Sequence, residues 1–285
     1  LNAMIVDSTA LHEQAVRDVL ASAFQSAGQR CSALRCLYIQ EDVEEDFLRM
    51  LLGAMDELRL GNPWSLTTDV GPVIDAEAAR DIQAHVDAAR AEGRLLKQLE
   101  APGDGHFIGP AAIRVAGIDD LEREIFGPVL HIATYAADQL DTVIDHINQR
   151  GYGLTFGLHT RIDDRVQHIV DRVHAGNIYV NRNQIGAIVA SQPFGGEGLS
   201  GTGPKAGGPD YVQRFAAHAA YDGPVAGAPA GEKVDPADLQ AQIAQTPEPV
   251  MPAQGTDMPG PTGESNRLYH VPRPPILCLG AGPEA

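Results

Sequence analysis

One cysteine stands in a turn between two regular segments. Residues 28–32 read GQRCS, after an apolar stretch with helical spacing and before an apolar stretch of strand type. Loops at the ends of α/β elements are where ligands meet reactive groups. A thiol there can act as a covalent nucleophile when its thiolate form is favoured. Because most cysteines are small buried apolar residues, position alone leaves both interpretations of Cys31 open.

Two further segments carry groups suited to ligand binding. Residues 124–129 (EIFGPV) place Glu124 just before a Gly-Pro turn, where its carboxylate could hold a ribose hydroxyl pair or simply be solvated. Residues 193–209 are glycine-rich, and the backbone N–H groups of such a loop can cradle an anion. The alternative is a flexible surface loop, since no strand–GxGxxG–helix setting marks a dinucleotide fingerprint.

Alternating helical and strand-like segments must position these groups. Apolar runs of strand type occupy residues 2–6, 34–40, 129–135, 156–160 and 177–181. Helical spacing of apolar residues is found at about 16–27, 43–58, 76–92, 140–147 and 166–173. This order predicts an α/β fold with a mainly parallel sheet. Asp7, Ser8 and Thr9 offer N-caps for the first helix, and Cys36 falls inside a strand and is expected in the core.

The bulk composition limits the class of protein. With 38 acidic and 21 basic residues the formal net charge is −17, which repels polyphosphate and disfavours nucleic-acid binding. Cys31, Cys36 and Cys278 form no metal-ligand pattern, so we expect no metal site and reduced thiols. No apolar run reaches the roughly 20 residues of a membrane helix, and no signal peptide is visible. We therefore expect a cytoplasmic protein.

The composition changes near Asp222. Residues 1–221 are expected to form the α/β domain. Residues 222–263 are dense in Pro, Gly and Ala and predict a disordered linker, with a possible short helix at 236–243. Residues 264–285 look like the start of a truncated next domain, with a strand at 276–280. Because the chain enters its first strand without a lead-in, we expect a fragment of a longer protein.

Seven short stretches, taken in order, resemble the aldehyde dehydrogenase superfamily across residues 2–215. They are 28–31 (GQRC), 61–63 (GNP), 71–72 (GP), 124–129 (EIFGPV), 152–154 (YGL), 176–181 (GNIYVN) and 193–201 (PFGGEGLSG). Residues 27–35, 69–75, 198–208 and 258–267 are most similar to bifunctional proline utilisation A. In that family proline dehydrogenase and L-glutamate-γ-semialdehyde (1-pyrroline-5-carboxylate) dehydrogenase share one chain. The resemblance implies an aldehyde dehydrogenase catalytic domain in residues 1–221.

The resemblance also implies an activity, the NAD-dependent oxidation of L-glutamate γ-semialdehyde to L-glutamate in proline catabolism. Cys31 would attack the aldehyde to give a thiohemiacetal and then a thioester. Glu124 would bind the nicotinamide ribose, and Phe126 would lie near the nicotinamide end. The substrate carboxylate would be bound by Ser32, Gly207 and Gly208. The aliphatic part of the substrate would lie against Phe194 or Phe215.

Some parts of the family's active site have no counterpart in the sequence. The cofactor-binding glycine loop, the oxyanion asparagine and the general-base glutamate would all precede Leu1. We therefore expect the N-terminal cofactor domain to be absent and the fragment to be inactive alone. FAD would belong only to a proline dehydrogenase module elsewhere in the same parent chain. A homo-oligomer is possible, although residues 222–231 depart from the family's usual intersubunit strand.

Three alternative functions stay open at this point. The chain could belong to another NAD(P)-dependent aldehyde dehydrogenase, or be a non-catalytic scaffold of the same fold. It could also be a hydrolase that uses Cys31 alone, although no His or Asp is placed by the sequence to activate that thiol. A pure scaffold has no physical need for Cys31, Glu124 and the glycine-rich loop together, which favours the enzyme.

Overall fold

The computed structural model describes residues 1–215, 240–241, 244 and 255–270. These residues form two compact units. The first comprises residues 1–187 and 194–205, and the second comprises 188–193 and the described residues from 206 onward. The helix expected at 236–243 lies largely outside the described residues, and the strand expected at 276–280 lies wholly outside them.

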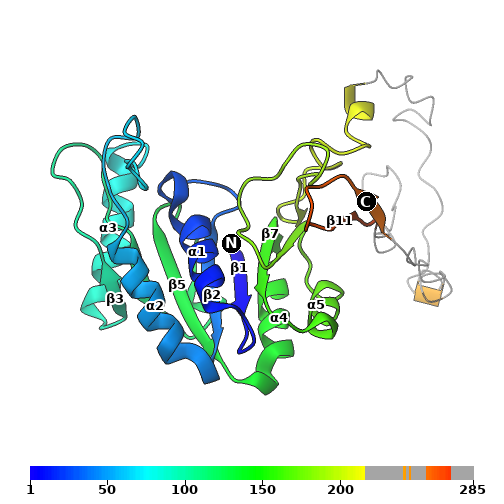
Figure 1. Ribbon diagram of the computed structural model, residues 1–285, viewed down its shortest axis with the longest axis horizontal. Helices are drawn as coiled ribbons and strands as arrows, with labels where there is room; N and C mark the ends of the chain where they lie inside the picture. Colours follow the sequence, from blue (N-terminus) through cyan, green and yellow to red (C-terminus); the bar gives the residue numbers. More distant parts are fainter. Residues whose placement is uncertain (216–239, 242–243, 245–254, 271–285) are drawn as a thin grey trace. The chain divides into compact units, whose positions relative to one another are not determined.

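The first unit is built on a mixed sheet in which β5, β2, β1 and β7 lie side by side (Figure 1). Its order among the described residues is β3-β4-β5-β2-β1-β7-β8. Only β3 runs antiparallel to its neighbour. The bounds are β1 Asn2–Val6, β2 Leu34–Gln40, β3 Leu95–Gln98, β4 Ala111–Arg114, β5 Val129–Tyr135, β7 Thr155–His159 and β8 Asn177–Val180.

The helices connect these strands in the order that the sequence predicts. The bounds are α1 His12–Phe24, α2 Glu44–Asp56, α3 Ala76–Ala91, α4 Leu140–Gln149 and α5 Asp163–Val170. From β1 and β2 the chain goes to the sheet edge at β3, returns through β4 to β5, and then crosses to β7 and β8 on the far side of β1. Right-handed crossovers therefore place α1 to α3 on one face of the sheet and α4 and α5 on the other.

Shorter elements complete both units. The one-turn helices are η1 Gln25–Gly28, η2 Glu41–Val43, η3 Ile118–Asp120, η4 Ala137–Gln139 and η5 Val212–Phe215. In the first unit β6 Tyr152–Gly153 pairs with β9 Glu197–Gly198. In the second unit β10 Thr256–Met258 and β11 Asn266–Leu268 form an antiparallel hairpin. The boundary expected between residues 263 and 264 falls inside this hairpin, and the assignment of three domains stays a prediction.

Burial on both faces explains why the central strands were easy to recognise. Every residue of β1 and β2 is buried, including Cys36 as expected, so these strands are mostly apolar, with Asn2, Arg35 and Gln40 as the polar exceptions. The α/β fold with a mainly parallel sheet is confirmed. The edge strand β3 and its neighbour β4 were missed, and β3 is only half-buried along its length, so it forms no apolar run in the sequence.

The expected N-cap of the first helix is wrong. α1 begins after Leu11, which gives no side-chain cap. Asp7 and Thr9 instead use their side chains at the end of the sheet, where Thr9 donates to Asp7 and Asp7 also accepts from Arg165. Asp7 and Thr9, which the local sequence indicated as helix caps, are therefore used in a buried ion-pair network with a distant segment.

Candidate active site

The candidate site lies at the edge of the sheet where the parallel strands begin. Cys31 precedes β2, and Glu124 and Phe126 precede β5. Asn2 and Thr155 are the first residues of β1 and β7. Because these strands are parallel neighbours, their first residues meet at one edge, here called the amino edge. The first unit therefore brings together Cys31, Ser32, Glu124 and Phe126.

The turn before Cys31 has an unusual backbone. Ser26, Ala27 and Gly28 all adopt left-handed conformations, with φ of 56°, 52° and 66°. Such φ values are costly for residues other than glycine, so neighbouring contacts must maintain them. Arg30 Nε donates to Ser26 Oγ at 3.0 Å and closes the turn. The outcome is an exposed Cys31 side chain on a tightly folded backbone.

An asparagine that the sequence reasoning overlooked fixes the nucleophile's backbone. Asn2 Nδ2 donates to the carbonyl oxygens of Cys31 and Ala33, at 2.8 and 2.9 Å. Its Oδ1 accepts the backbone N–H of Thr155 at 3.2 Å. A lone amide at the start of an apolar strand was the available signal, since a buried amide needs partners.

The next residue is held as firmly. The carbonyl oxygen of Ser32 accepts from Thr155 Oγ1 at 3.1 Å and from Gln184 Nε2 at 3.3 Å. Ser32 itself is buried, beside the exposed Cys31. Hydrogen bonds to the carbonyl oxygens of Cys31, Ser32 and Ala33 thus fix the main chain at the nucleophile and leave its thiol at the surface.

Glu124 is ion-paired with a second residue that the sequence reasoning missed. Arg35 Nε donates to Glu124 Oε1 at 3.0 Å, and the side chains are 0% and 35% exposed. Burial lowers the pKa of the Arg35 guanidinium, and the charge of Glu124 opposes that shift. Among the described residues Glu124 Oε2 accepts no hydrogen bond. One carboxylate oxygen is held, and the other is open to a ligand.

These residues fit the ribose and nicotinamide end of a dinucleotide. A partly exposed carboxylate with one open oxygen suits a hydroxyl donor. Phe126 is 45% exposed and presents an apolar ring next to that carboxylate. The guanidinium of Arg35 lies 4.9 Å from the ring centroid on the protein side. The arrangement matches the roles expected for Glu124 and Phe126, which remain proposals.

The glycine-rich loop is held by internal hydrogen bonds in the first unit. Gly195 N–H donates to Asn177 Oδ1 at 3.1 Å, and Leu199 N–H donates to the Gly151 oxygen at 2.8 Å. Lys205 Nζ donates to the Gly195 oxygen at 2.7 Å. Residues 195–201 therefore use backbone groups internally and make a poor anion cradle. Phe194, at the start of this loop, is half-buried.

The remaining expected substrate residues belong to the second unit. The carbonyl oxygens of Gly207 and Gly208 accept from Ala190 and Tyr211 N–H, at 3.2 and 3.3 Å. Neither glycine N–H donates to another group within the described residues. Phe215 is exposed and meets Tyr211 edge-on, with ring centroids 5.8 Å apart. Ser32 and these residues lie in different units, so their joint role stays a prediction.

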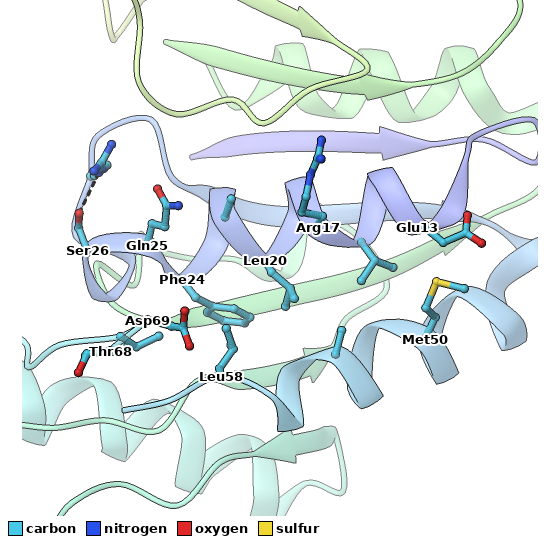
Figure 2. A pocket seen from close by; sticks show the side chains of 15 residues that line it. Glu13, Arg17, Leu20, Phe24, Gln25, Ser26, Met50, Leu58, Thr68 and Asp69 are labelled. Carbon is cyan, nitrogen blue, oxygen red and sulfur yellow. Dashed lines mark hydrogen bonds between the residues drawn. The ribbon is translucent and has the colours of Figure 1, made fainter. Parts of the chain in front are cut away.

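A separate groove of about 700 Å³ runs along α1 and α2 (Figure 2). Leu20 and Phe24 of α1 and Leu58 beyond α2 line its apolar floor, and Ser26 stands at one end. Arg30 is also a lining residue. Cys31 and Glu124 are not among its lining residues. This groove is therefore distinct from the residues suited to chemistry. Within the described residues no three potential ligands converge on a metal position.

Comparison with known proteins decides the family. The profile of the aldehyde dehydrogenase family matches residues 1–219. The chain belongs to this family. It is 46% identical over 310 residues to bifunctional protein PutA of Klebsiella aerogenes, covering 98% of this chain and 24% of that protein. It is 38% identical to 1-pyrroline-5-carboxylate dehydrogenase of Geobacillus sp. (strain WCH70), covering 73% and 41%. The sequence-based resemblance is thus confirmed.

Solved structures agree with this assignment. A mutant of Bradyrhizobium japonicum proline utilization A matches with a TM-score of 0.74 at 53% identity, covering 76% of this chain and 22% of that one. A Thermus 1-pyrroline-5-carboxylate dehydrogenase with bound NAD matches with a TM-score of 0.69 at 34% identity, covering 75% and 42%. The chain therefore spans about a quarter of the length of the PutA proteins that it matches.

Proposed function

We propose that this chain supplies the nucleophile-bearing part of an NAD-dependent dehydrogenase that oxidises L-glutamate γ-semialdehyde to L-glutamate. The observation that carries the proposal is the amino edge itself. There an exposed thiol on an anchored turn lies beside a partly exposed carboxylate with one open oxygen. The family membership and the 1-pyrroline-5-carboxylate dehydrogenases among its relatives support the reaction.

Cys31 accounts for the covalent steps of the reaction. Its thiolate adds to the aldehyde carbon, and the carbonyl oxygen becomes the oxyanion of a thiohemiacetal. The backbone N–H of Cys31 would donate to that oxyanion and stabilise its charge. Bound NAD supplies the hydride acceptor, so that a thioester remains on Cys31. Water then releases the acid and restores the thiol.

Glu124 and Phe126 would orient the cofactor for this exchange. The open oxygen of Glu124 accepts a ribose hydroxyl, while Arg35 holds the carboxylate in place. Phe126 limits the space on the nicotinamide side. Anchoring of the substrate carboxylate is proposed for Ser32 with the N–H groups of Gly207 and Gly208, since two N–H donors and a hydroxyl suit a carboxylate. Phe194 or Phe215 would cover the aliphatic part.

We further propose that this segment acts within a longer cytoplasmic protein that also carries a proline dehydrogenase module with its FAD. The relatives called bifunctional are about four times as long as the matched region. Sparse cysteines without a metal-ligand pattern fit a reducing compartment. No helix among the described residues is long and apolar enough to cross a membrane.

The test is NADH formation with L-glutamate γ-semialdehyde in the longer protein, compared with its Cys31→Ala variant. We expect turnover to fall at least about 1,000-fold, because the nucleophile is lost while its backbone anchors remain. The thermal midpoint should not change, since the side chain is exposed. The 285-residue chain alone is expected to form no NADH.

Cys36→Ala is the matched control. Cys36 is buried in β2, so its loss should cost about 1 kcal/mol of stability and leave turnover within about threefold. Ester hydrolysis without aldehyde oxidation would instead indicate a hydrolase. Aldehyde oxidation that survives in Cys31→Ala would remove Cys31 from the mechanism.

A further inference from the structure

We infer that Arg35 is the positioning residue that holds the nucleophile turn and the cofactor-binding segment in one fixed arrangement. This inference rests on the proposed function, because it assigns a role toward the same site. Arg35 lies at the start of β2 and its side chain is completely buried. It contacts groups from both segments, which are about 90 residues apart in the chain.

The guanidinium divides its donors between the two segments. Nη2 donates to the carbonyl oxygen of Arg30, the residue before the nucleophile, at 3.3 Å. Nε donates to Glu124 Oε1 at 3.0 Å, and Nη1 donates to the Gly127 oxygen at 3.1 Å. Its face packs on the ring of Phe126. One planar group therefore contacts the backbone next to the nucleophile, the Glu124 carboxylate that is proposed to bind the ribose, and the Phe126 ring.

The two segments also touch directly, which makes their relative position sensitive to this group. A Cβ on Gly28 would lie 2.1 Å from the Gly127 oxygen, so the two backbones are in contact. The backbone of Arg35 is held as well, because His131 Nδ1 lies 3.0 Å from its carbonyl oxygen. The guanidinium thus extends from a strand whose backbone is held in place. It bridges two segments whose backbones are already in contact at Gly28 and Gly127.

Lysine could not replace this geometry. The guanidinium is planar, and each of its three nitrogen atoms donates to a different acceptor. An ammonium on a flexible stem is a point charge that could satisfy Glu124 or the Arg30 carbonyl with poor geometry at the other. The inference therefore predicts that charge alone does not rescue the function.

The experiment measures KM for NAD, KM for the aldehyde and kcat in the longer protein for Arg35→Lys and Arg35→Met. We expect Arg35→Lys to raise KM for NAD at least about tenfold and to change KM for the aldehyde less than about threefold. Arg35→Met should also lower kcat at least about tenfold, because the Arg30 carbonyl loses its donor. A general loss of structure would not separate the two KM values.

A double-mutant cycle with Glu124→Gln tests whether the two residues act together. Adding Arg35→Lys to Glu124→Gln should raise KM for NAD less than about threefold further, since the shared contact is already altered. Arg114→Met is the matched control, because Arg114 also pairs with a glutamate, Glu44, outside the site. Additive effects, or an unchanged KM for NAD in Arg35→Lys with normal thermal stability, would overturn the inference.

A second readout keeps the inference testable if the proposed function fails. Alkylation of Cys31 by iodoacetamide needs neither NAD nor aldehyde and can be followed at that residue by peptide mass spectrometry. Arg35 Nη2 holds the carbonyl oxygen of Arg30, immediately before Cys31, so Arg35→Met should let this turn move and change the alkylation rate at least about fivefold. Arg35→Lys should change the rate less, because an ammonium can still donate to one of the three acceptors. Equal rates in Arg35→Met and Arg114→Met would overturn the inference even if the wild-type protein oxidises no aldehyde.

Discussion

The two edges of the main sheet use buried charge in different ways. At the amino edge, buried Arg35 holds Glu124, whose side chain is 35% exposed. At the opposite edge, where β1 and β7 end, Asp7 is 0% exposed and pairs with Arg165, with Nη1 to Oδ2 at 2.6 Å. Here the buried partner is the acid. The first edge presents its carboxylate to solvent, whereas the second encloses it.

The carboxylate at the carboxyl edge is fully committed to the protein. Thr9 donates to Asp7 through its backbone N–H and its hydroxyl, each at 2.7 Å, and Thr160 Oγ1 donates to the other carboxylate oxygen. Burial raises the pKa of Asp7, but hydrogen bonds from Thr160, Thr9 and Arg165 outweigh it and leave the pKa below its ordinary value. Such a group stabilises a fold and leaves nothing for a ligand.

The difference shows how to distinguish a site from a scaffold in this fold. Ligands in open α/β sheets usually bind outside the carboxyl ends of parallel strands, yet that edge here is closed by Asp7 and its partners. An exposed nucleophile and an open carboxylate oxygen mark the amino edge instead. Both edges contain buried charge. They differ in whether the carboxylate still has an oxygen that accepts no hydrogen bond from the protein.

The largest test of this contrast is Asp7→Asn. Removing the charge leaves Arg165 without its buried partner, so we expect a loss of about 3 kcal/mol in the free energy of unfolding, measured in urea. The lowered pKa of Asp7 means that this stabilisation is present above the ordinary carboxyl range and is lost as pH falls through the folded-state pKa. The variant should therefore be less sensitive to acid.

Asp141→Asn is the control for that measurement, because Asp141 is an exposed partner of His168 and Arg172. Its urea midpoint should match the wild-type value within error. For turnover in the longer protein, Asp7→Asn should keep kcat per folded molecule. A specific loss of kcat with intact folding would mean that the carboxyl edge contributes to catalysis and would break the contrast.

Gly28→Ala tests the amino edge. Gly28 has a φ of +66°, and its Cβ would meet the Gly127 backbone at 2.1 Å. Gly93→Ala is the matched control, since Gly93 has a φ of +71° with open space around it. We expect about 1 kcal/mol of destabilisation in Gly93→Ala from backbone strain and about 2 kcal/mol more in Gly28→Ala from the collision. Equal urea midpoints for the two variants would contradict the close contact.

The smallest expected effect concerns a buried histidine near the carboxyl edge. Burial lowers the pKa of His159 to about 4. The unfolded chain takes up this proton near pH 6.5 and the folded chain does not, so stability falls as pH drops through this window. We expect about 1 kcal/mol less unfolding free energy at pH 5.5 than at pH 7 from this group. His159→Leu should remove that difference.

The partner of His159 requires its own control. Asp18 Oδ2 lies 3.8 Å from His159 Nε2, and burial raises the pKa of Asp18. A raised carboxyl pKa acts in the opposite direction, because the folded state then takes up the proton first. Measuring Asp18→Asn at the same two pH values separates the two contributions. An unchanged pH dependence in His159→Leu would show that His159 is not held neutral.

Local patterns were sufficient for the central strands and for Cys31. The stretch 34–40 is apolar apart from Arg35 and Gln40 because β2 is buried on both faces, and its bounds were predicted as observed. Gly28 marked the end of the first helical region, and the motif around Cys31 carried the family resemblance. Arg35 was not recognised, because a single cation in an apolar run says nothing about acceptors that arrive from residues 124–127.

The sequence by itself determined the central strands, the helices between them, the mainly parallel sheet and the family, since apolar periodicity and short motifs are local properties. Only the tertiary structure decided which polar groups are committed to the fold and which are open. Asp7 and Glu124 are both carboxylates beside parallel strands, yet one is enclosed by Thr9, Thr160 and Arg165 while the other keeps a free oxygen. The physical reason is that the hydrogen-bond donors that satisfy a carboxylate come from distant parts of the chain, and a local sequence pattern does not show them.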